Sequence, residues 1–256
     1  TFATNVSGTN NLLQALAQTN TARAIVVTTT DKVYRNANDG RAFAETDPLG
    51  GHDPYSASKA ACEMVVDGWR SRFAELGCAI ATARAGNVIG GGDWADDRLI
   101  PDAVKAWSSG QSLQVRRPDA TRPWQHVLEP LRGYLVLAEK LLSGTEIAPA
   151  YNFGPGTDSA TVRKVLSMAA AEFADAKTDF AITEDGPVEA RALALDPGLA
   201  ESDLGIRSLW DLDQTVARTA RWYRAFLEGR SARDLCKADC DAYLDDVRLA
   251  SMAGIR

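Results

Sequence analysis

The chain has 256 residues, of which 45% are hydrophobic and 24% charged, a composition typical of a globular protein with a large buried core. Its formal net charge of -6 disfavours non-specific binding to nucleic acid or to an anionic membrane surface. No apolar run approaches the roughly 20 residues that a membrane-spanning helix needs, and no secretory leader pattern is present, so we expect a cytoplasmic protein.

The first 92 residues alternate between helical and strand patterns. In chain order we expect a helix over 1–18, a buried strand over 24–29, a polar loop over 31–54, a helix over 55–76, a buried strand over 78–85 and a glycine-rich turn over 86–92. Short apolar strands separated by an amphipathic helix are typical of a parallel sheet covered by helices. The sequence therefore predicts an α/β fold with a Rossmann-like, doubly wound parallel sheet.

The pattern after residue 92 is mixed α+β. We expect helices over 99–109, 160–173 and 209–227, strands over 113–115 and 150–153, and a helix after Val127 with Glu129 as its N-cap and Pro130 at its first position. This division predicts the latter part of a nucleotide-binding domain over 1–92. It also predicts a mainly substrate-binding portion over 93–256, some segments of which return to the sheet.

The four cysteines do not suggest a metal site. Cys62 and Cys78 fall in apolar stretches and are expected to be buried free thiols. Cys236 and Cys240 have neither histidines nor further cysteines nearby to complete a ligand set, so we expect no metal.

Tyr55 and Lys59 are spaced to share one face of the predicted helix. A lysine held beside a tyrosine would stabilise tyrosinate and allow the phenol to act as a general base near neutral pH. The same spacing often arises by chance, and a solvated helix face is the simpler interpretation. However, Thr30, Asp31 and Lys32 directly follow a predicted strand, and two polar clusters of this kind favour the active site of an α/β enzyme.

Several motifs together resemble the extended short-chain dehydrogenase/reductase family, in its nucleotide-sugar dehydratase branch. They are Thr4-Asn5-Val6-x-Gly8-Thr9, Thr30-Asp31-Lys32, Tyr55-x-x-x-Lys59 and Arg84-Ala85-Gly86-Asn87-Val88. The segments 86–94, 97–102 and 122–131 are most similar to the CDP-glucose 4,6-dehydratases of that branch. The resemblance implies tightly held NAD, a CDP-sugar substrate and a role in deoxysugar biosynthesis, including that of lipopolysaccharide O-antigen.

The resemblance also implies catalytic roles. Tyr55 takes the proton from the hydroxyl on carbon 4, while Lys59 lowers the tyrosine pKa and binds the nicotinamide ribose, and Thr30 hydrogen-bonds the same sugar oxygen. Asp31 is the acid that protonates the leaving hydroxyl, which burial would favour by keeping its proton. Lys32 occupies the position of the base that acts on carbon 5, and it can do so only if desolvation or cationic neighbours lower its pKa. A surface charge is the alternative interpretation of Lys32.

Five binding residues follow from the same resemblance: Thr4 and Val88 toward the cofactor, and Asn87, Arg98 and Arg122 toward the substrate. Arginines suit a nucleoside diphosphate because their planar guanidinium groups bind phosphate oxygens in pairs. Arg122 could instead form a salt bridge with Glu129 or Asp119.

Other residues near these motifs have alternative interpretations. The glycines of 90–92 could form either a phosphate cradle or a simple turn, His126 is expected to be a packed core histidine, and His52 could line the site or cap the helix that follows it. Arg191 stands where relatives usually carry His or Tyr, which puts nucleotide contacts there in doubt.

No Gly-x-x-Gly-x-x-Gly turn occurs in this chain, although a dinucleotide site needs such a turn for its pyrophosphate. In the family this element precedes the segment that matches Thr1. We therefore expect the chain to begin inside the Rossmann domain and, by itself, to be unstable and inactive. The family also implies a homodimer through the helices 1–18 and 55–76.

Two other functions remain open. A related epimerase or ketoreductase would keep Tyr55 and Lys59 without needing Asp31 and Lys32. The second alternative is a non-catalytic nucleotide-sugar or NAD-binding protein. Such a protein would have no use for a tyrosine with a lowered pKa, so the presence of Thr30, Tyr55 and Lys59 together disfavours this alternative.

Overall fold

The computed structural model describes residues 1–37, 39–156, 159–180 and 193–254. Its contacts divide the chain into two compact units. The first unit comprises Thr1–Gly86, Pro130–Thr157 and Leu193–Arg207, and the second comprises Asn87–Glu129, Asp158–Ala192 and Ser208–Arg256.

A three-stranded parallel sheet forms the centre of the first unit. Its order is β1 (Ala24–Thr28), β2 (Ala79–Ala85) and β7 (Ala150–Phe153). The register pairs Ala24 with Ala79 and Thr82 with Ala150, so all three strands end at the same edge. β2 is buried over most of its length, which explains its run of small and β-branched residues. The predicted parallel sheet is confirmed.

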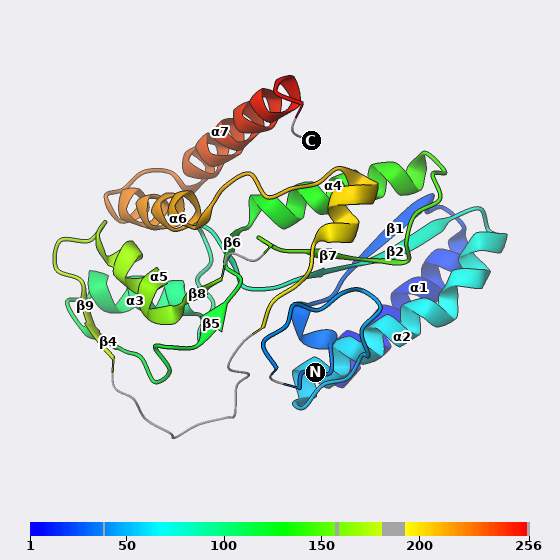
Figure 1. Ribbon diagram of the computed structural model, residues 1–256, viewed down its shortest axis with the longest axis horizontal. Coiled ribbons are helices and arrows are strands. Elements are labelled where there is room, and N and C mark those ends of the chain that lie inside the picture. The colour runs from blue at the N-terminus through cyan, green and yellow to red at the C-terminus, as the bar shows by residue number, and fades with distance from the viewer. Residues whose placement is uncertain (38, 157–158, 181–192, 255–256) are drawn as a thin grey trace. The chain divides into compact units, whose positions relative to one another are not determined.

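Helices cover both faces of this sheet (Figure 1). On one face, α1 (Gly8–Thr19), which continues the short helix η1 (Ala3–Ser7), lies beside α2 (Pro54–Glu75). Leu13, Val66 and Phe73 belong to the core cluster on this side. On the other face, α4 (Leu128–Leu142) contributes Leu137 and Leu141 to a second cluster.

The start of α2 shows how local sequence fixes a helix end. Asp53 is the N-cap, and its carboxylate accepts hydrogen bonds from the backbone N–H groups of Tyr55 and Ser56. Pro54 occupies the first turn, where its missing N–H costs nothing. His52 is exposed, and the capping group is its neighbour Asp53. The alternative that His52 caps this helix was therefore wrong.

The segment between β1 and α2 is more ordered than the expected polar loop. It begins with a short 3-10 helix, η2 (Asp31–Val33), and Val33, Tyr34 and Phe43 are buried in a third cluster. The rings of Tyr34 and Phe43 stack with their centroids 4.9 Å apart. The glycines and prolines suggested a loop, but its apolar side chains hold it against the body of the unit. The π-helix η3 (Ala200–Leu204) completes this unit.

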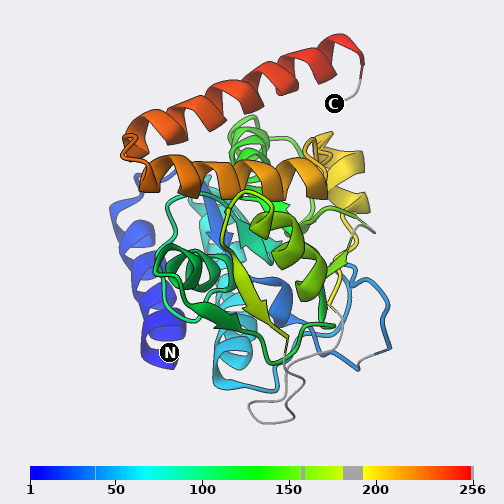
Figure 2. The same cartoon turned by 90° about the vertical axis from the view of Figure 1, so that its left-hand side faces the viewer.

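In its described residues, the second unit contains paired short strands and four helices. The pairs are β3 (Val88–Ile89) with β6 (Gln125–His126), β4 (Ser112–Gln114) with β9 (Lys177–Asp179), and β5 (Thr121–Arg122) with β8 (Ala160–Thr161). The helices are α3 (Leu99–Ser108), α5 (Val162–Ala170), α6 (Leu212–Leu227) and α7 (Ala232–Met252). α6 and α7 run across one side of this unit, coloured orange and red in Figure 2.

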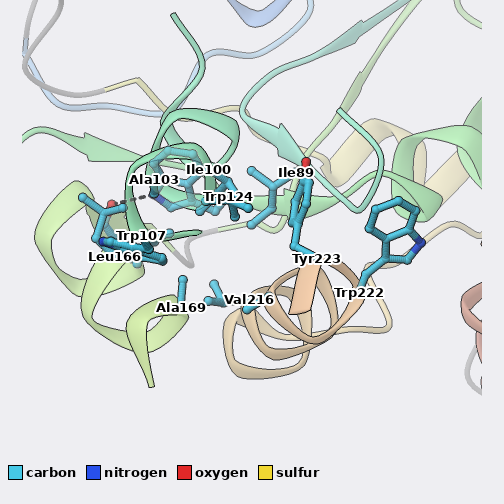
Figure 3. Packing of buried hydrophobic residues seen from close by; sticks show 14 of the residues in the cluster. Ile89, Ile100, Ala103, Trp107, Trp124, Leu166, Ala169, Val216, Trp222 and Tyr223 are labelled. Carbon is cyan, nitrogen blue, oxygen red and sulfur yellow. Dashed lines mark hydrogen bonds between the residues drawn. The ribbon is translucent and has the colours of Figure 1, made fainter. Parts of the chain in front are cut away.

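Tryptophan and tyrosine rings dominate the core of the second unit (Figure 3). Trp107 comes from α3, and Trp222 and Tyr223 from α6, whereas Trp124 precedes β6. The indole N–H of Trp124 donates to the backbone oxygen of Ala160, 3.0 Å away, so this buried polar group is satisfied.

Three features of this unit differ from the sequence predictions. The expected helix over 160–173 begins as the strand β8, and α5 starts only after Thr161, because that residue caps the helix by accepting from the N–H of Lys164. The helix ends at Ala170. The helix α7 was not predicted. Glu129 lies inside the first turn of α4, and its carboxylate accepts hydrogen bonds from the backbone N–H groups of Leu209 and Trp210, so it is not the N-cap. Among the described helices, none is long and apolar enough to cross a membrane.

Candidate active site

Thr30 and Asp31 lie directly beyond the carboxyl end of β1. The backbone turns there into η2, and the Thr30 hydroxyl oxygen accepts a hydrogen bond from the N–H of Lys32 at 3.4 Å. The same hydroxyl donates to the Asp31 carboxylate at 3.0 Å. Both side chains are buried, with Asp31 only 1% exposed. Ligands of parallel α/β sheets bind at this edge, so the position suits residues that act on a substrate.

Tyr55 and Lys59 stand on α2, one turn apart, and the Lys59 side chain reaches this same strand end. The Lys59 ammonium donates to the carbonyl oxygen of Thr28, the last residue of β1, at 3.4 Å. Tyr55 as a whole residue is 41% exposed. The structure therefore brings the helix that carries Tyr55 and Lys59 to the strand that leads into Thr30.

Lys32 is exposed, and its positive charge acts on Asp53, the N-cap of α2. Burial raises the pKa of the Asp53 carboxyl, but hydrogen bonds from Ser56 and Tyr55 and the charge of Lys32 outweigh it, so this pKa is lowered overall. Lys32 thus lies near the beginning of the Tyr55 helix. The charged neighbour of Lys32 is thus the Asp53 carboxylate, an anion. From the sequence, the base role of Lys32 was expected to require desolvation or cationic neighbours.

Gly86, directly after β2, leaves the space that the Asp31 carboxylate fills. A Cβ at Gly86 would lie 1.8 Å from the Asp31 carboxylate oxygen Oδ2. Gly86 is absent from the positions with positive φ, so the close approach alone explains the glycine. The ends of β1 and β2 therefore fix Asp31 from two sides.

These groups fit the nicotinamide-ribose end of a bound NAD. An ammonium and a hydroxyl lie beyond one strand end, and the helix that carries the ammonium also carries the exposed residue Tyr55; such groups supply donors and acceptors for ribose and sugar hydroxyls. Thr4, which was expected to face the cofactor, is exposed on η1, and its neighbour Asn5 donates from its side-chain amide to the Ser58 hydroxyl on α2 at 2.9 Å. The glycine-rich turn expected for the pyrophosphate is not among this chain's residues.

The second unit carries the remaining predicted binding residues. Asn87 has a left-handed backbone (φ 49°), and its carbonyl oxygen accepts from the N–H of Gln125. Val88 is 38% exposed on β3, and Arg98 is exposed immediately before α3.

Arg122 is buried, and its guanidinium donates to the carbonyl oxygen of Thr121 at 2.9 Å. Asp119, one of the two alternative partners of Arg122, forms an ion pair with Arg163.

Gly90 and Gly91 are explained by packing, whereas Gly92 has a left-handed backbone with φ 90°. A Cβ at Gly91 would lie 2.0 Å from the Trp222 ring, and one at Gly90 would lie 2.7 Å from the Val127 side chain. Close packing of this kind, rather than a phosphate ligand, accounts for these two glycines. Arg191 and the segment around it lie outside the described residues. Within the described ranges, no group of three or more His, Cys, Asp or Glu side chains could hold a metal.

His126 is a buried core residue, 1% exposed, as expected. Its Nδ1 accepts from the backbone N–H of Leu128, and its ring meets that of Trp210 edge to face at 4.7 Å. Burial, followed by repulsion from Arg218, lowers the pKa of His126 to about 4.

The buried imidazole of His126 should therefore make the protein acid-sensitive. The unfolded state binds a proton near pH 6.5 and the folded state only near pH 4, so stability present above pH 6.5 is lost as pH falls toward 4. At pH 4 we expect His126→Phe to remove up to about 3 kcal/mol of the wild-type decline in unfolding free energy. Chemical denaturation from pH 7.5 to 4 measures this, with the exposed His52→Phe as control. Parallel declines in all three proteins would contradict the assignment.

One buried ion pair near the predicted catalytic residues, that of Glu63 and Arg84, was not identified from the sequence. Glu63, one turn beyond Lys59 on α2, is 4% exposed and forms an ion pair with Arg84 at 2.8 Å. The available signal was its spacing: Tyr55, Lys59 and Glu63 follow each other at four-residue intervals along one helix.

Comparison with known proteins places these observations in a family. Residues 1–154 match the model of the NAD dependent epimerase/dehydratase family. CDP-glucose 4,6-dehydratase of Salmonella typhimurium is 38% identical over 252 residues, which cover 95% of this chain and 70% of that protein. dTDP-glucose 4,6-dehydratase of Streptomyces griseus is 27% identical over 224 residues, covering 86% of this chain and 64% of the relative.

Solved structures agree with these relatives. The dTDP-glucose 4,6-dehydratase of Streptomyces venezuelae, determined with NAD bound, superposes with a TM-score of 0.74 at 27% identity, covering 88% of this chain and 66% of that one. The chain thus spans roughly two thirds of the length of these relatives. The family model covers more than half of the chain, and the fold and the Salmonella relative agree with it. The chain belongs to the NAD-dependent epimerase/dehydratase family, which has a Rossmann-type fold.

Proposed function

We propose that the whole protein containing this chain is an NAD-dependent CDP-glucose 4,6-dehydratase, a hydro-lyase that forms CDP-4-keto-6-deoxyglucose. The observation that carries the proposal is the contact of the Lys59 ammonium with Thr28, since it joins the Tyr55 helix to the strand that leads into Thr30 and Asp31. The 38% identity to the Salmonella CDP-glucose enzyme supports CDP over other nucleotides. Four free cysteines suit the reducing cytoplasm.

Tyr55 is the base for the first proton in this proposal. As tyrosinate, stabilised by the Lys59 ammonium, it removes the proton of the hydroxyl on carbon 4. The Thr30 hydroxyl hydrogen-bonds the same oxygen and orients it. NAD, when bound, accepts the hydride from carbon 4 and returns it to carbon 6.

Asp31 and Lys32 serve the loss of water between carbons 5 and 6. The ketone at carbon 4 acidifies the hydrogen on carbon 5, and Asp31 in its protonated form gives its proton to the leaving hydroxyl of carbon 6. The burial of Asp31 supports this role. Lys32 takes the proton from carbon 5 once the bound sugar has excluded water from its amine.

The binding residues complete the proposal. Asn87 hydrogen-bonds the substrate, and Arg98 and Arg122 bind its diphosphate, for which guanidinium groups are suited. Thr4 and Val88 lie against the cofactor. These assignments rest on the family motifs.

The decisive experiment is incubation of the whole protein with CDP-glucose and, separately, with dTDP-glucose and GDP-mannose. A 4-keto-6-deoxy product formed from CDP-glucose with the highest kcat/KM supports the proposal. Epimerised sugar without keto product would identify the epimerase alternative. Tight CDP-glucose binding without turnover would identify a non-catalytic binding protein.

We also propose that the whole protein is a homodimer through α1 and α2. Leu12 on α1 and Met64 on α2 are 60% and 63% exposed, a large apolar exposure for neighbouring helices. Leu12→Lys with Met64→Lys should convert the dimer to a monomer, because buried unpaired ammonium groups oppose association. Sedimentation velocity measures this. Leu249→Lys on α7, at 63% exposure, is the matched control and should remain dimeric. A monomeric wild-type protein would refute the proposal.

A further inference from the structure

Glu63 and Arg84 form a buried, fully engaged ion pair between α2 and β2. The Arg84 guanidinium binds the carboxylate with two donors, Nε to Oε1 at 3.0 Å and Nη2 to Oε2 at 2.8 Å. The exposed fractions of the two side chains are 5% and 3%. Buried ion pairs of this kind add little stability compared with apolar side chains, so their presence calls for another reason.

The two ends of this pair reach the two sides of the segment that carries the predicted catalytic residues. Glu63 accepts a hydrogen bond from the hydroxyl of Thr29, the residue before Thr30. Arg84 donates from Nη1 to the hydroxyl of Tyr34, the residue that ends η2, at 2.8 Å. Thr30, Asp31 and Lys32 therefore lie between two side chains that are bound to the same pair.

The far side of this network is anchored as well. The Tyr34 hydroxyl donates to the side-chain oxygen of Asn152 on β7 at 2.6 Å, and the Asn152 amide donates to the backbone oxygen of Phe43 at 2.8 Å. Since Arg84 lies on β2, the network connects η2 to two strands of the sheet and to the Tyr55 helix.

Both partners of the pair are held in their charged forms. Burial raises the pKa of Glu63, but the hydrogen bonds and charge of Arg84, together with the hydrogen bonds from Thr29 and Thr82, outweigh it, so the pKa of the carboxyl is lowered overall. Burial lowers the pKa of Arg84, but the same contacts with Glu63 outweigh it and the pKa is raised. A fixed charged pair of this kind makes stronger hydrogen bonds than neutral groups would.

We propose that the Glu63–Arg84 pair is a positioning device for the reaction: it clamps η2 at Thr29 and Tyr34, and thereby sets Thr30 and Asp31 against Tyr55 and Lys59. Glu63 and Lys59 lie one turn apart on α2, so the clamp and the Tyr55–Lys59 pair share one rigid element. The inference rests on the proposed dehydratase function for its kinetic consequence, but its structural part can be tested alone.

The carboxylate of Glu63 offers a matched pair of variants. Two threonine hydroxyls donate to it, Thr29 to Oε1 and Thr82 to Oε2, and only Thr29 adjoins the predicted catalytic segment. Thr29→Val and Thr82→Val each remove one such hydrogen bond and keep the side-chain shape. We expect Thr29→Val to lower kcat for CDP-glucose about tenfold with KM within twofold, because misplacement affects the transition state more than binding. Thr82→Val should change kcat less than twofold, and Thr29→Ser should restore it.

Hydrogen exchange of the peptide over residues 29–36, measured by mass spectrometry, tests the clamp without turnover. Thr29→Val and Tyr34→Phe should each speed exchange there severalfold, whereas Thr82→Val should leave it at the wild-type rate. Equal kcat in Thr29→Val and Thr82→Val, or unchanged exchange in Thr29→Val, would overturn the inference. Absence of wild-type turnover on CDP-glucose would overturn the proposed function instead, and the exchange rates would still decide whether the pair clamps η2.

Discussion

Tyr55→Phe in the whole protein should lower kcat for CDP-glucose by about a thousandfold or more, because it removes the group that takes the first proton. Tyr55 is 41% exposed, so loss of its hydroxyl should leave the melting temperature nearly unchanged. KM should change little, because the aromatic ring still occupies the site. Product formation can be followed through the absorbance of the 4-keto sugar in alkali, and the fold through thermal unfolding.

Tyr223→Phe is the matched control for that experiment. Its hydroxyl is buried in the second unit and donates to the backbone oxygen of Asp93 at 2.6 Å. Removing it should cost about 1 kcal/mol of stability and leave kcat close to wild type. Undiminished turnover in Tyr55→Phe would disprove the role of Tyr55 and, with it, the proposed chemistry.

Gly86→Ala should lower kcat about a hundredfold, the second largest effect that we expect. The new Cβ would lie 1.8 Å from the Asp31 carboxylate, so the acid must move away from its place beyond β1. A displacement of about 1 Å at a reacting group can cost this much in rate. The overpacking should also lower the unfolding free energy by about 1–3 kcal/mol. Steady-state kinetics and denaturant unfolding measure the two effects.

Gly68→Ala separates that steric effect from the general consequence of adding a methyl group. Gly68 is exposed within α2, and a Cβ there would meet nothing within 4 Å. Alanine favours a helix interior, so this variant should gain up to about 1 kcal/mol of stability with unchanged kcat. Because Gly68 lies one turn beyond Met64 on α2, sedimentation velocity must show that the variant has the same oligomeric state as the wild type. Full activity in Gly86→Ala would show that the position of Asp31 is not critical.

Local patterns were sufficient to predict the main elements around the site. The apolar run that became β1 and the Asp53–Pro54 start of α2 are signals carried by adjacent residues, so they can be recognised without tertiary information. At other positions, tertiary contacts outweighed the local sequence pattern. Glu129 resembled an N-cap, but the backbone N–H groups that it binds come from Leu209 and Trp210, 80 and 81 residues later.

The candidate active site likewise combines features set by local sequence with features set by tertiary contacts. The sequence by itself determined that Tyr55 and Lys59 share a helix face and that Thr30, Asp31 and Lys32 follow a strand, because both facts depend only on spacing along one element. Only the tertiary structure decided that Gly86 makes room for Asp31 and that Glu63 binds Arg84. Those contacts join segments whose separation is set by the register of β1 and β2 and by the crossover of α2, and no local pattern encodes a distance across a sheet.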